Sequence, residues 1–200
     1  MISVSKGVVL VFTPFLRTSI FLLDLYMEKI AVFCSASREC PAEYNLCAEK
    51  VIEGLCGKGY GIVSGGTRLG TMNVVSETVV KCGGFHKGVL PRFMEGVAFQ
   101  GLSELVWTDT MSERKEEMRR DTIATIALPG GIGTLDELIE THVLKKLRCY
   151  GGRVIVLNLD GFFQPFLSLL DHYVQTGMLT PQDRRLVEVY ATAEDLLASF

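Results

Sequence analysis

From residue 28 onward, short and almost wholly apolar runs alternate with longer segments whose apolar residues recur at helical spacing. The apolar runs predict strands over residues 30–34, 60–63, 85–90, 104–107, 123–128 and 154–159. The helically spaced segments predict helices over residues 42–57, 71–82, 111–120, 134–149, 162–176 and 193–199. We expect residues 92–102 to be irregular.

Strands that alternate with helices indicate βαβ units and therefore a parallel sheet. The predicted strands are almost wholly apolar, which is typical of strands covered by helices on both faces. No internal repeat, low-complexity tract or interdomain linker interrupts the pattern. The sequence therefore predicts one α/β domain whose ligand lies beyond the carboxyl ends of the strands, where the glycine-rich loops fall.

The first 26 residues do not fit this pattern. Residues 8–26 are largely apolar but contain Pro14, Arg17 and Asp24. A signal peptide needs an uninterrupted apolar core, and a spanning helix needs about 20 apolar residues without interior charges. We expect residues 1–26 to be an extra segment, from an upstream start codon or a weak targeting sequence. We expect the domain to occupy residues 27–200 and not to associate with a membrane.

Composition narrows the class of ligand. Apolar residues make up 48% of the chain, charged residues 22%, and the net charge is −3. This balance is typical of a globular protein and argues against a protein that coats nucleic acid, which needs a basic surface. A small anion can still be held by local hydrogen-bond donors.

The six cysteines contain no Cys-x-x-Cys pair and no histidine at zinc-finger spacing. We therefore expect buried, reduced thiols, a cytoplasmic location and no metal site. A catalytic cysteine–histidine pair is the weaker alternative, since none of the three histidines shares a motif with a cysteine.

A glycine-rich turn joins the strand at 123–128 to the helix that follows. It reads Pro-Gly-Gly-Ile-Gly-Thr and contains Gly130, Gly131, Gly133 and Thr134. Glycines let the backbone approach a ligand closely, and the start of a helix offers free N–H groups and a positive dipole end. The turn therefore predicts a phosphate site in which Thr134 caps the helix and donates its hydroxyl. The alternative is a tight turn without a ligand.

Two charged residues near this turn have an ordinary and a chemical interpretation. Glu137, in the first turn of the predicted helix, either complements the helix dipole or faces the sugar of a bound nucleotide. Arg114 belongs to a charged segment that would ordinarily be a solvated helix with pairs such as Glu116 with Arg120. The chemical interpretation directs Arg114 into the cleft, where it clamps hydroxyl or phosphate oxygens.

Taken in order, the segments Met111–Lys115 and Pro129–Glu137 resemble the paired motifs M-x-x-R-K and P-G-G-x-G-T-x-x-E of the LONELY GUY family. These cytokinin-activating phosphoribohydrolases are often mislabelled lysine decarboxylases. The resemblance runs from about Glu28 to about Gly177. Further matching pieces are Phe33–Ser37, Ser64–Gly66, Gly88–Pro91 and Leu157–Phe163.

The resemblance implies a Rossmann-like, doubly wound parallel sheet flanked by helices, and a homodimer. It implies hydrolysis of the N-glycosidic bond of a nucleoside 5′-monophosphate, which releases free base and ribose 5-phosphate without a cofactor. Arg114 and Glu137 match the catalytic pair of the family, and Gly130, Gly131, Gly133 and Thr134 match its phosphate-binding turn. Further substrate contacts are expected from Ser35, Ser37, Gly65, Gly66 and Lys115.

The chain departs from the family pattern in the first loop and in a helix that forms the base end of the pocket or the dimer contact in the family. Ser35-Ala36-Ser37 stands where the family has Gly-Ser-Ser, and Val143–Arg148 stands where it often has Thr-Trp-x-Gln-Leu-Gly. Two other functions stay open on the same fold. One is a non-catalytic nucleotide binder or carrier, and the other is transfer of the ribosyl group to an acceptor other than water.

Overall fold

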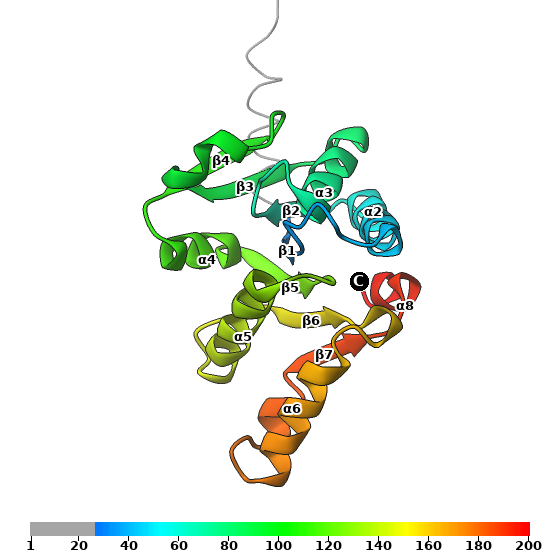
Figure 1. The fold of residues 1–200 in the computed structure, drawn as a ribbon, viewed down its shortest axis with the longest axis vertical. Helices are drawn as coiled ribbons and strands as arrows, with labels where there is room; N and C mark the ends of the chain where they lie inside the picture. Colours follow the sequence, from blue (N-terminus) through cyan, green and yellow to red (C-terminus); the bar gives the residue numbers. More distant parts are fainter. Residues whose placement is uncertain (1–26) are drawn as a thin grey trace, which may run out of the picture.

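The computed structural model describes residues 27–200, so the predicted extra segment 1–26 lies outside the described residues. Seven parallel strands form one sheet (Figure 1). They are β1 (Lys29–Phe33), β2 (Gly61–Ser64), β3 (His86–Pro91), β4 (Glu104–Thr108), β5 (Thr122–Ala127), β6 (Arg153–Leu157) and β7 (Val187–Tyr190). No helix in residues 27–200 is long and apolar enough to cross a membrane.

The order of the strands is β4-β3-β2-β1-β5-β6-β7. The chain enters at the centre with β1, runs outward to β4, and returns to the other side of β1 with β5. Phe33 at the end of β1 is level with Ala127 at the end of β5. The strand order therefore reverses between these two strands, which is where a doubly wound sheet opens a crevice for a ligand. This confirms the predicted fold class.

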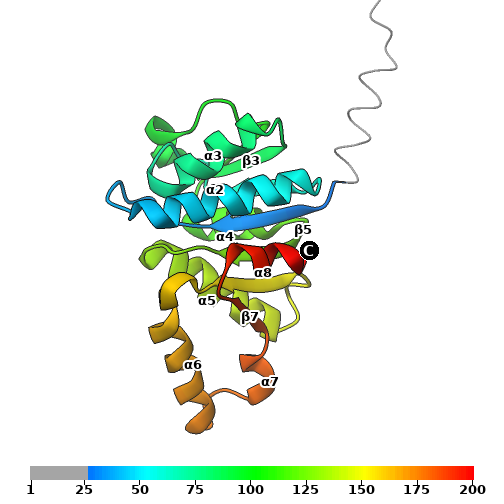
Figure 2. The same ribbon diagram turned by 90° about the vertical axis from the view of Figure 1, so that its right-hand side faces the viewer.

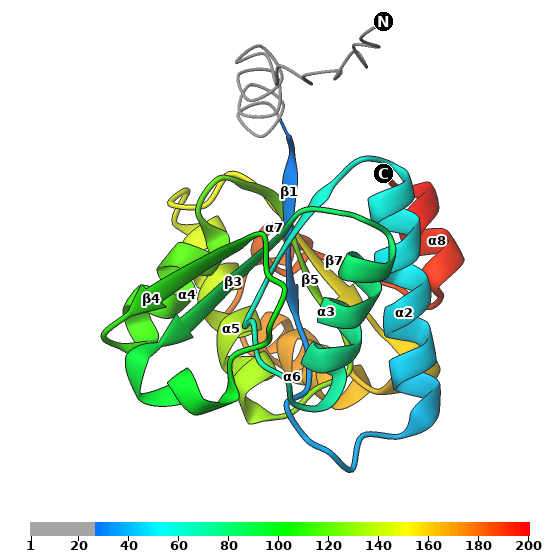
Figure 3. The same cartoon turned by 90° about the horizontal axis from the view of Figure 1, so that it is seen from above.

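Helices cover both faces of the sheet, as the apolar strands predict (Figure 3). The helices are α2 (Ala42–Gly57), α3 (Gly70–Lys81), α4 (Met111–Arg119), α5 (Ile132–Lys146), α6 (Gln164–Gln175), α7 (Pro181–Arg184) and α8 (Ala193–Ala198). Two short 3-10 helices, η1 (Arg92–Val97) and η2 (Leu159–Gly161), complete the described structure.

Alternate residues of β1 pack on opposite layers. Ile30 and Val32 pack with buried side chains of α2, α3 and α8. Ala31 and Phe33 pack with Met118 of α4 on the other face. Figure 2 shows α2 and α8 lying across one face of the sheet. A second cluster joins α5 and α6 to β6 and β7, and these layers hold the central strand ends in place.

Three segments differ from their predicted state. The sequence pattern predicts neither β7 nor α7, and the region expected to be irregular contains η1. The helix α5 begins at Ile132, two residues before its predicted start. It ends at Lys146, three residues before its predicted end, and the other boundaries agree with the predicted ones to within about two residues.

Candidate active site

A cavity of about 340 Å³ opens at the reversal point of the sheet. The loop after β1, the start of α5, two side chains of α4, and single side chains from α3 and η1 line it. The volume lies in the range of small-ligand sites. Of the predicted site residues, the cavity wall includes Ser35, Ser37, Arg114, Gly131, Gly133, Thr134 and Glu137.

The start of α5 carries groups suited to an anion. Gly131 precedes the helix as its N-cap, and no side chain caps the first turn. The first backbone N–H groups of the helix are therefore free to donate to a ligand. Thr134 is 3% exposed, and its hydroxyl oxygen has no hydrogen-bond partner among the described residues. An unpartnered hydroxyl beside free helix N–H groups forms a cradle for phosphate oxygens.

Two details of the predicted turn are wrong because α5 begins two residues early. Thr134 lies inside the helix instead of capping it, and the cap position belongs to Gly131. Glu137 consequently lies in the second turn and not the first. Its distance from the helix start weakens the interpretation of Glu137 as a partner of the helix dipole, which acts mainly within the first turn.

Gly130 is required by packing against this cradle. A Cβ atom at Gly130 would collide with the Thr134 hydroxyl and lie 3.1 Å from the backbone nitrogen of Ser35. Gly130 thus lets the turn after β5 lie against the loop after β1. Gly131 and Gly133 have open space around them.

Arg114 and Glu137 form a buried ion pair in the cavity wall. The Arg114 Nη1 atom donates to Glu137 Oε1 at 2.8 Å, and each side chain is 5% exposed. The Arg114 Nε atom donates to the carbonyl of Val89 at 3.0 Å. These contacts connect α4, α5 and the end of β3, three elements that the sequence separates widely.

The start of α4 is fixed by a reciprocal cap. The Thr110 hydroxyl accepts from the Glu113 backbone N–H at 3.1 Å, while a Glu113 carboxylate oxygen accepts from the Thr110 N–H at 3.3 Å. Such a capping box holds the first turn rigidly. Arg114 follows directly, so its side chain leaves the helix in a defined direction.

The charge of Glu137 is balanced between two effects. Burial raises the pKa of Glu137, whereas the neighbouring Arg114 lowers it, and the net shift is upward. Burial alone would favour the neutral acid. Arg114 therefore opposes the effect of burial on the Glu137 pKa, through its charge and through its hydrogen bond to the carboxylate.

The remaining predicted residues surround the cavity without lining it. The turn after β2 contains Gly65 and Gly66, and a Cβ atom at Gly65 would collide with Arg114 Nη2. Lys115 points to α5 instead, where its Nζ atom contacts Asp136 at 3.0 Å and also Glu140. The structure therefore brings Gly65 against Arg114 and places Lys115 between two helices.

The pattern of the sequence did not indicate the apolar part of the wall. Met72 of α3, Met94 of η1 and Met111 of α4 line the cavity together with Thr67. Methionines in amphipathic helices resemble ordinary core residues, so spacing alone carries no signal for them. Of the three, only Met111 stands in a recognisable motif.

Cysteine chemistry does not fit this site. Cys34 lines the cavity, but burial raises its pKa, so the thiol stays protonated. The buried His86 contacts Ser64 at 2.8 Å, and His142 contacts the carbonyl of Asp183 at 2.8 Å. Within residues 27–200 no group of three or more His, Cys, Asp or Glu side chains is placed to hold a metal ion.

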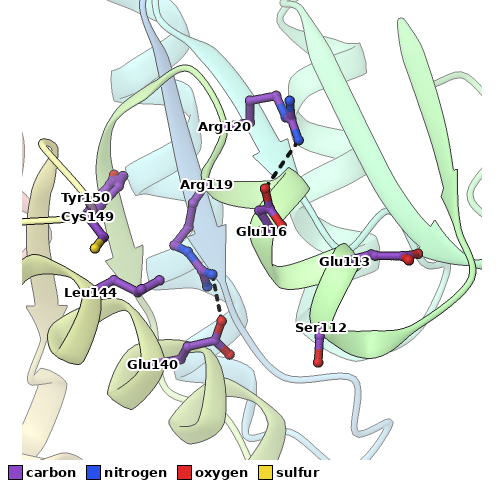
Figure 4. A pocket seen from close by; sticks show the side chains of 9 residues that line it. All are labelled: Ser112, Glu113, Glu116, Arg119, Arg120, Glu140, Leu144, Cys149 and Tyr150. Atoms are coloured by element: carbon purple, nitrogen blue, oxygen red, sulfur yellow. Dashed lines mark hydrogen bonds and ion pairs between the residues drawn. The ribbon is translucent and has the colours of Figure 1, made fainter. Parts of the chain in front are cut away.

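A larger and more open depression, of about 600 Å³, lies between α4 and α5 (Figure 4). Its charged groups pair with one another, Arg119 with Glu140 at 2.7 Å and Arg120 with Glu116 at 3.5 Å. The second pair is the one predicted from spacing. None of the predicted site residues lines this depression, so the smaller cavity is the candidate active site.

Comparison with known proteins identifies relatives of this chain. The family described as "Possible lysine decarboxylase" matches residues 72–200, which include Arg114 and the whole turn. The probable cytokinin riboside 5′-monophosphate phosphoribohydrolase LOGL5 of Oryza sativa subsp. japonica is 37% identical, over 85% of this chain and 70% of that protein. The cytokinin riboside 5′-monophosphate phosphoribohydrolase LOG5 of Arabidopsis thaliana is 33% identical, over 85% of this chain and 75% of that protein.

Solved structures share the fold at lower identity. The molybdenum cofactor carrier protein of Chlamydomonas reinhardtii has a TM-score of 0.65 at 20% identity, over 86% of this chain and 95% of that one. The molybdenum cofactor binding protein of Rippkaea orientalis has a TM-score of 0.67 at 18% identity, over 88% and 96%. These likenesses concern the fold alone, whereas the sequence matches show that the chain belongs to the LONELY GUY family of cytokinin riboside 5′-monophosphate phosphoribohydrolases.

Proposed function

We propose that the cavity hydrolyses the N-glycosidic bond of a purine nucleoside 5′-monophosphate, AMP or an N6-modified AMP, and releases the free base and ribose 5-phosphate. The observation that carries the proposal is the buried Arg114–Glu137 pair beside the open start of α5. Together they offer a carboxylate for the sugar and donors for the phosphate. The family names attached to the relatives support the same reaction.

The phosphate is assigned to the cradle at α5. The free N–H groups after Gly131 and the hydroxyl of Thr134 are donors without partners in residues 27–200. A doubly charged phosphate there satisfies these donors and meets the positive end of the helix dipole. Glu137 lies one turn further along α5 on the cavity side, at the position of the ribose.

The chemical step requires stabilisation of a positively charged sugar. As the bond from C1′ to the base breaks, the ribose takes on oxocarbenium character, as in other glycoside hydrolyses. The Glu137 carboxylate stabilises this charge and orients the water that attacks C1′. Water supplies the hydroxyl group of ribose 5-phosphate and the proton that the departing base takes up. Arg114 keeps Glu137 ionised and in place.

The apolar wall is assigned to the base. Met72, Met94 and Met111 give a flexible, polarisable surface that suits a purine ring and an apolar substituent on it. Ser35 and Ser37, in the loop after β1, line the same cavity. We assign them to hydroxyl groups of the ribose or to the phosphate.

Two alternatives use the same cavity. A nucleotide carrier would bind the ligand and release it unchanged, and a ribosyl transferase would need an acceptor other than water. The Arg114–Glu137 pair favours a hydrolase over a carrier, because burying an ion pair is costly and phosphate binding does not require it. A transferase would also have to bind an acceptor molecule, and the described residues give no feature that selects such an acceptor over water.

Incubation of the purified protein with AMP, N6-prenylated AMP and adenosine tests the proposal. We expect free base and ribose 5-phosphate in equal amounts from at least one monophosphate, and far slower release from adenosine because it cannot use the α5 cradle. Binding of a monophosphate without any release would favour the carrier and overturn the hydrolase.

We further propose that the protein is a cytoplasmic homodimer. The location is supported by the six cysteines, all of which are free thiols in the described structure. The dimer is supported by an apolar stripe on the solvent side of α5, formed by Ile139, Val143 and Leu147, which are 43%, 47% and 61% exposed. Their spacing of four residues places them on one face, where a second copy would cover them.

A further inference from the structure

The strand β3 begins with a histidine that the proposed reaction does not use. His86 is fully buried, and burial lowers its pKa to about 4, so the imidazole is neutral near neutral pH. Its Nε2 atom lies 2.8 Å from the hydroxyl of Ser64 at the end of β2, and its Nδ1 atom has no partner in residues 27–200. The imidazole makes one side-chain hydrogen bond, and the surrounding contacts decide whether His86 or Ser64 is its donor.

The Ser64 hydroxyl determines that direction. Its oxygen accepts from the backbone N–H of Gly66 at 3.1 Å. If Ser64 donates its proton to His86 Nε2, the pair leaves only the Nδ1–H group unpaired. The opposite direction leaves both the serine proton and the Nδ1 lone pair unpaired. Buried polar groups avoid being left unpaired, so His86 is the acceptor and Ser64 the donor.

The turn that Ser64 holds lies against the catalytic arginine. Gly66 has φ +62° and packs on Gly88, where a Cβ atom would lie 2.8 Å from the Gly88 Cα. At Gly65 a Cβ atom would collide with Arg114 Nη2 and lie 2.9 Å from Met72 Sδ. The backbone of Gly65 is therefore a close wall that limits where the guanidinium of Arg114 can lie.

We propose that His86 is a positioning residue for the reaction, which acts through Ser64 to hold the Gly65–Gly66 turn against Arg114. His86 fixes the rotamer of the Ser64 hydroxyl, Ser64 holds the Gly66 N–H, and the turn holds Arg114 in line with Glu137. His86 does not touch the substrate. The inference rests on the proposed function for its effect on turnover, but the contacts that carry it are independent of any substrate.

Two replacements of His86 distinguish its role as a hydrogen-bond acceptor from its role in filling space in the core. His86→Leu fills the space without an acceptor, whereas His86→Gln restores an amide oxygen that the Ser64 hydroxyl can reach. With the monophosphate that the wild type hydrolyses, we expect kcat to fall about tenfold or more in His86→Leu, because displacements of about 1 Å are costly in catalysis. KM should change less than about threefold, and His86→Gln should regain most of kcat.

A second measurement does not depend on turnover. Amide hydrogen exchange at Gly66, followed by NMR, reports the bond from its N–H to Ser64 directly. We expect faster exchange at Gly66 in His86→Leu and near wild-type exchange in His86→Gln. Absence of turnover in the wild type would contradict the proposed function alone, whereas unchanged Gly66 exchange in His86→Leu would contradict the positioning role alone.

Loss of stability is controlled by a variant far from the site. Leu170→Ala in α6 removes a buried side chain from the cluster that joins α5 and α6 to β6 and β7. It destabilises the fold without contact to the Gly65–Gly66 turn. If Leu170→Ala lowers kcat as much as His86→Leu at equal loss of thermal stability, the role is structural and the proposal is wrong. It is also wrong if His86→Gln is as slow as His86→Leu. If His86→Leu does not fold, Ser64→Ala removes the same link and is expected to give the same kcat loss.

Discussion

Arg114 and Glu137 are a buried ion pair, so the chemistry proposed for them carries a cost in folding. Each side chain is 5% exposed, and taking two charges out of water is compensated only when geometry and further hydrogen bonds are good. Arg114 has such support from the carbonyl of Val89 and from the capped start of α4. The rule that buried charges need partners thus explains why α4, β3 and α5 converge on one point.

Arg114→Lys tests the planar, multi-donor geometry of the arginine. Lysine keeps the charge but cannot contact Val89 and Glu137 at once. We expect kcat/KM for the monophosphate to fall at least about 100-fold, comparable to removal of a preorganised electrostatic group. Arg120→Lys, a 55% exposed position on the same segment, is the matched control and should stay near the wild-type rate. Similar rates for both variants would remove Arg114 from the catalytic site.

The helix α5 brings the functional groups of the site together at the scale of an element. Its start supplies the anion cradle, its second turn supplies Glu137, and its outer face carries the apolar stripe. The pattern of apolar residues predicted this helix but placed its start at Thr134. The cap is Gly131, and local reasoning misses it because glycine lacks the Ser, Thr, Asp or Asn side chain that normally marks a helix start.

Thr134→Val separates binding from stability in this element. The variant keeps the shape of threonine and removes only the hydroxyl, which has no protein partner in the described structure. We expect KM for the monophosphate to rise about tenfold or more, since hydrogen bonds to charged groups contribute about 1.5–3 kcal/mol. The midpoint of thermal unfolding should not fall. A fall in stability without a change in KM would show that the hydroxyl serves the fold and not the phosphate.

Other elements show where prediction from sequence succeeds and fails. Strands covered on both faces, such as β1 and β5, are mostly apolar runs, and the sequence predicts them closely. The edge strand β7 reads Val-Glu-Val-Tyr, and its Glu188 pairs with Arg153 of β6 at 2.6 Å. A four-residue, half-exposed strand with a charge inside gives too weak a pattern for local reasoning.

The same contrast holds within the site. The glycine turn and the Arg114–Glu137 pair stand in spaced motifs, so they could be predicted. Met72, Met94 and His86 could not, because their roles arise from contacts between distant segments and each resembles a core residue in its own segment. Lys115 stands in a motif, yet its ammonium group is held by Asp136 and Glu140.

At the scale of the whole molecule, the strand order puts the candidate site beyond the carboxyl ends of the inner strands β1 and β5, with α5 beside it (Figure 1). The stripe of Ile139, Val143 and Leu147 is an apolar surface that a monomer would leave in water. A dimer formed along α5 would lie close to the active site on the same helix.

Val143→Glu tests the proposed dimer. A charge at the centre of the stripe should prevent a second copy from covering it, because a buried unpaired carboxylate is strongly unfavourable. We expect the wild type to be dimeric and Val143→Glu monomeric by light scattering at micromolar concentration. Leu46→Glu, at a 65% exposed apolar position on α2, is the matched control and should stay dimeric. A monomeric wild type would contradict the proposal.

The most direct test of the account is the behaviour of Glu137→Gln toward AMP and N6-prenylated AMP, with release of base and binding measured on the same sample. The substitution keeps size and hydrogen-bonding capacity and removes the negative charge that should stabilise the sugar in the transition state. The account predicts that monophosphate binding persists while release of base and ribose 5-phosphate falls by at least about 100-fold. Release at the wild-type rate would contradict it.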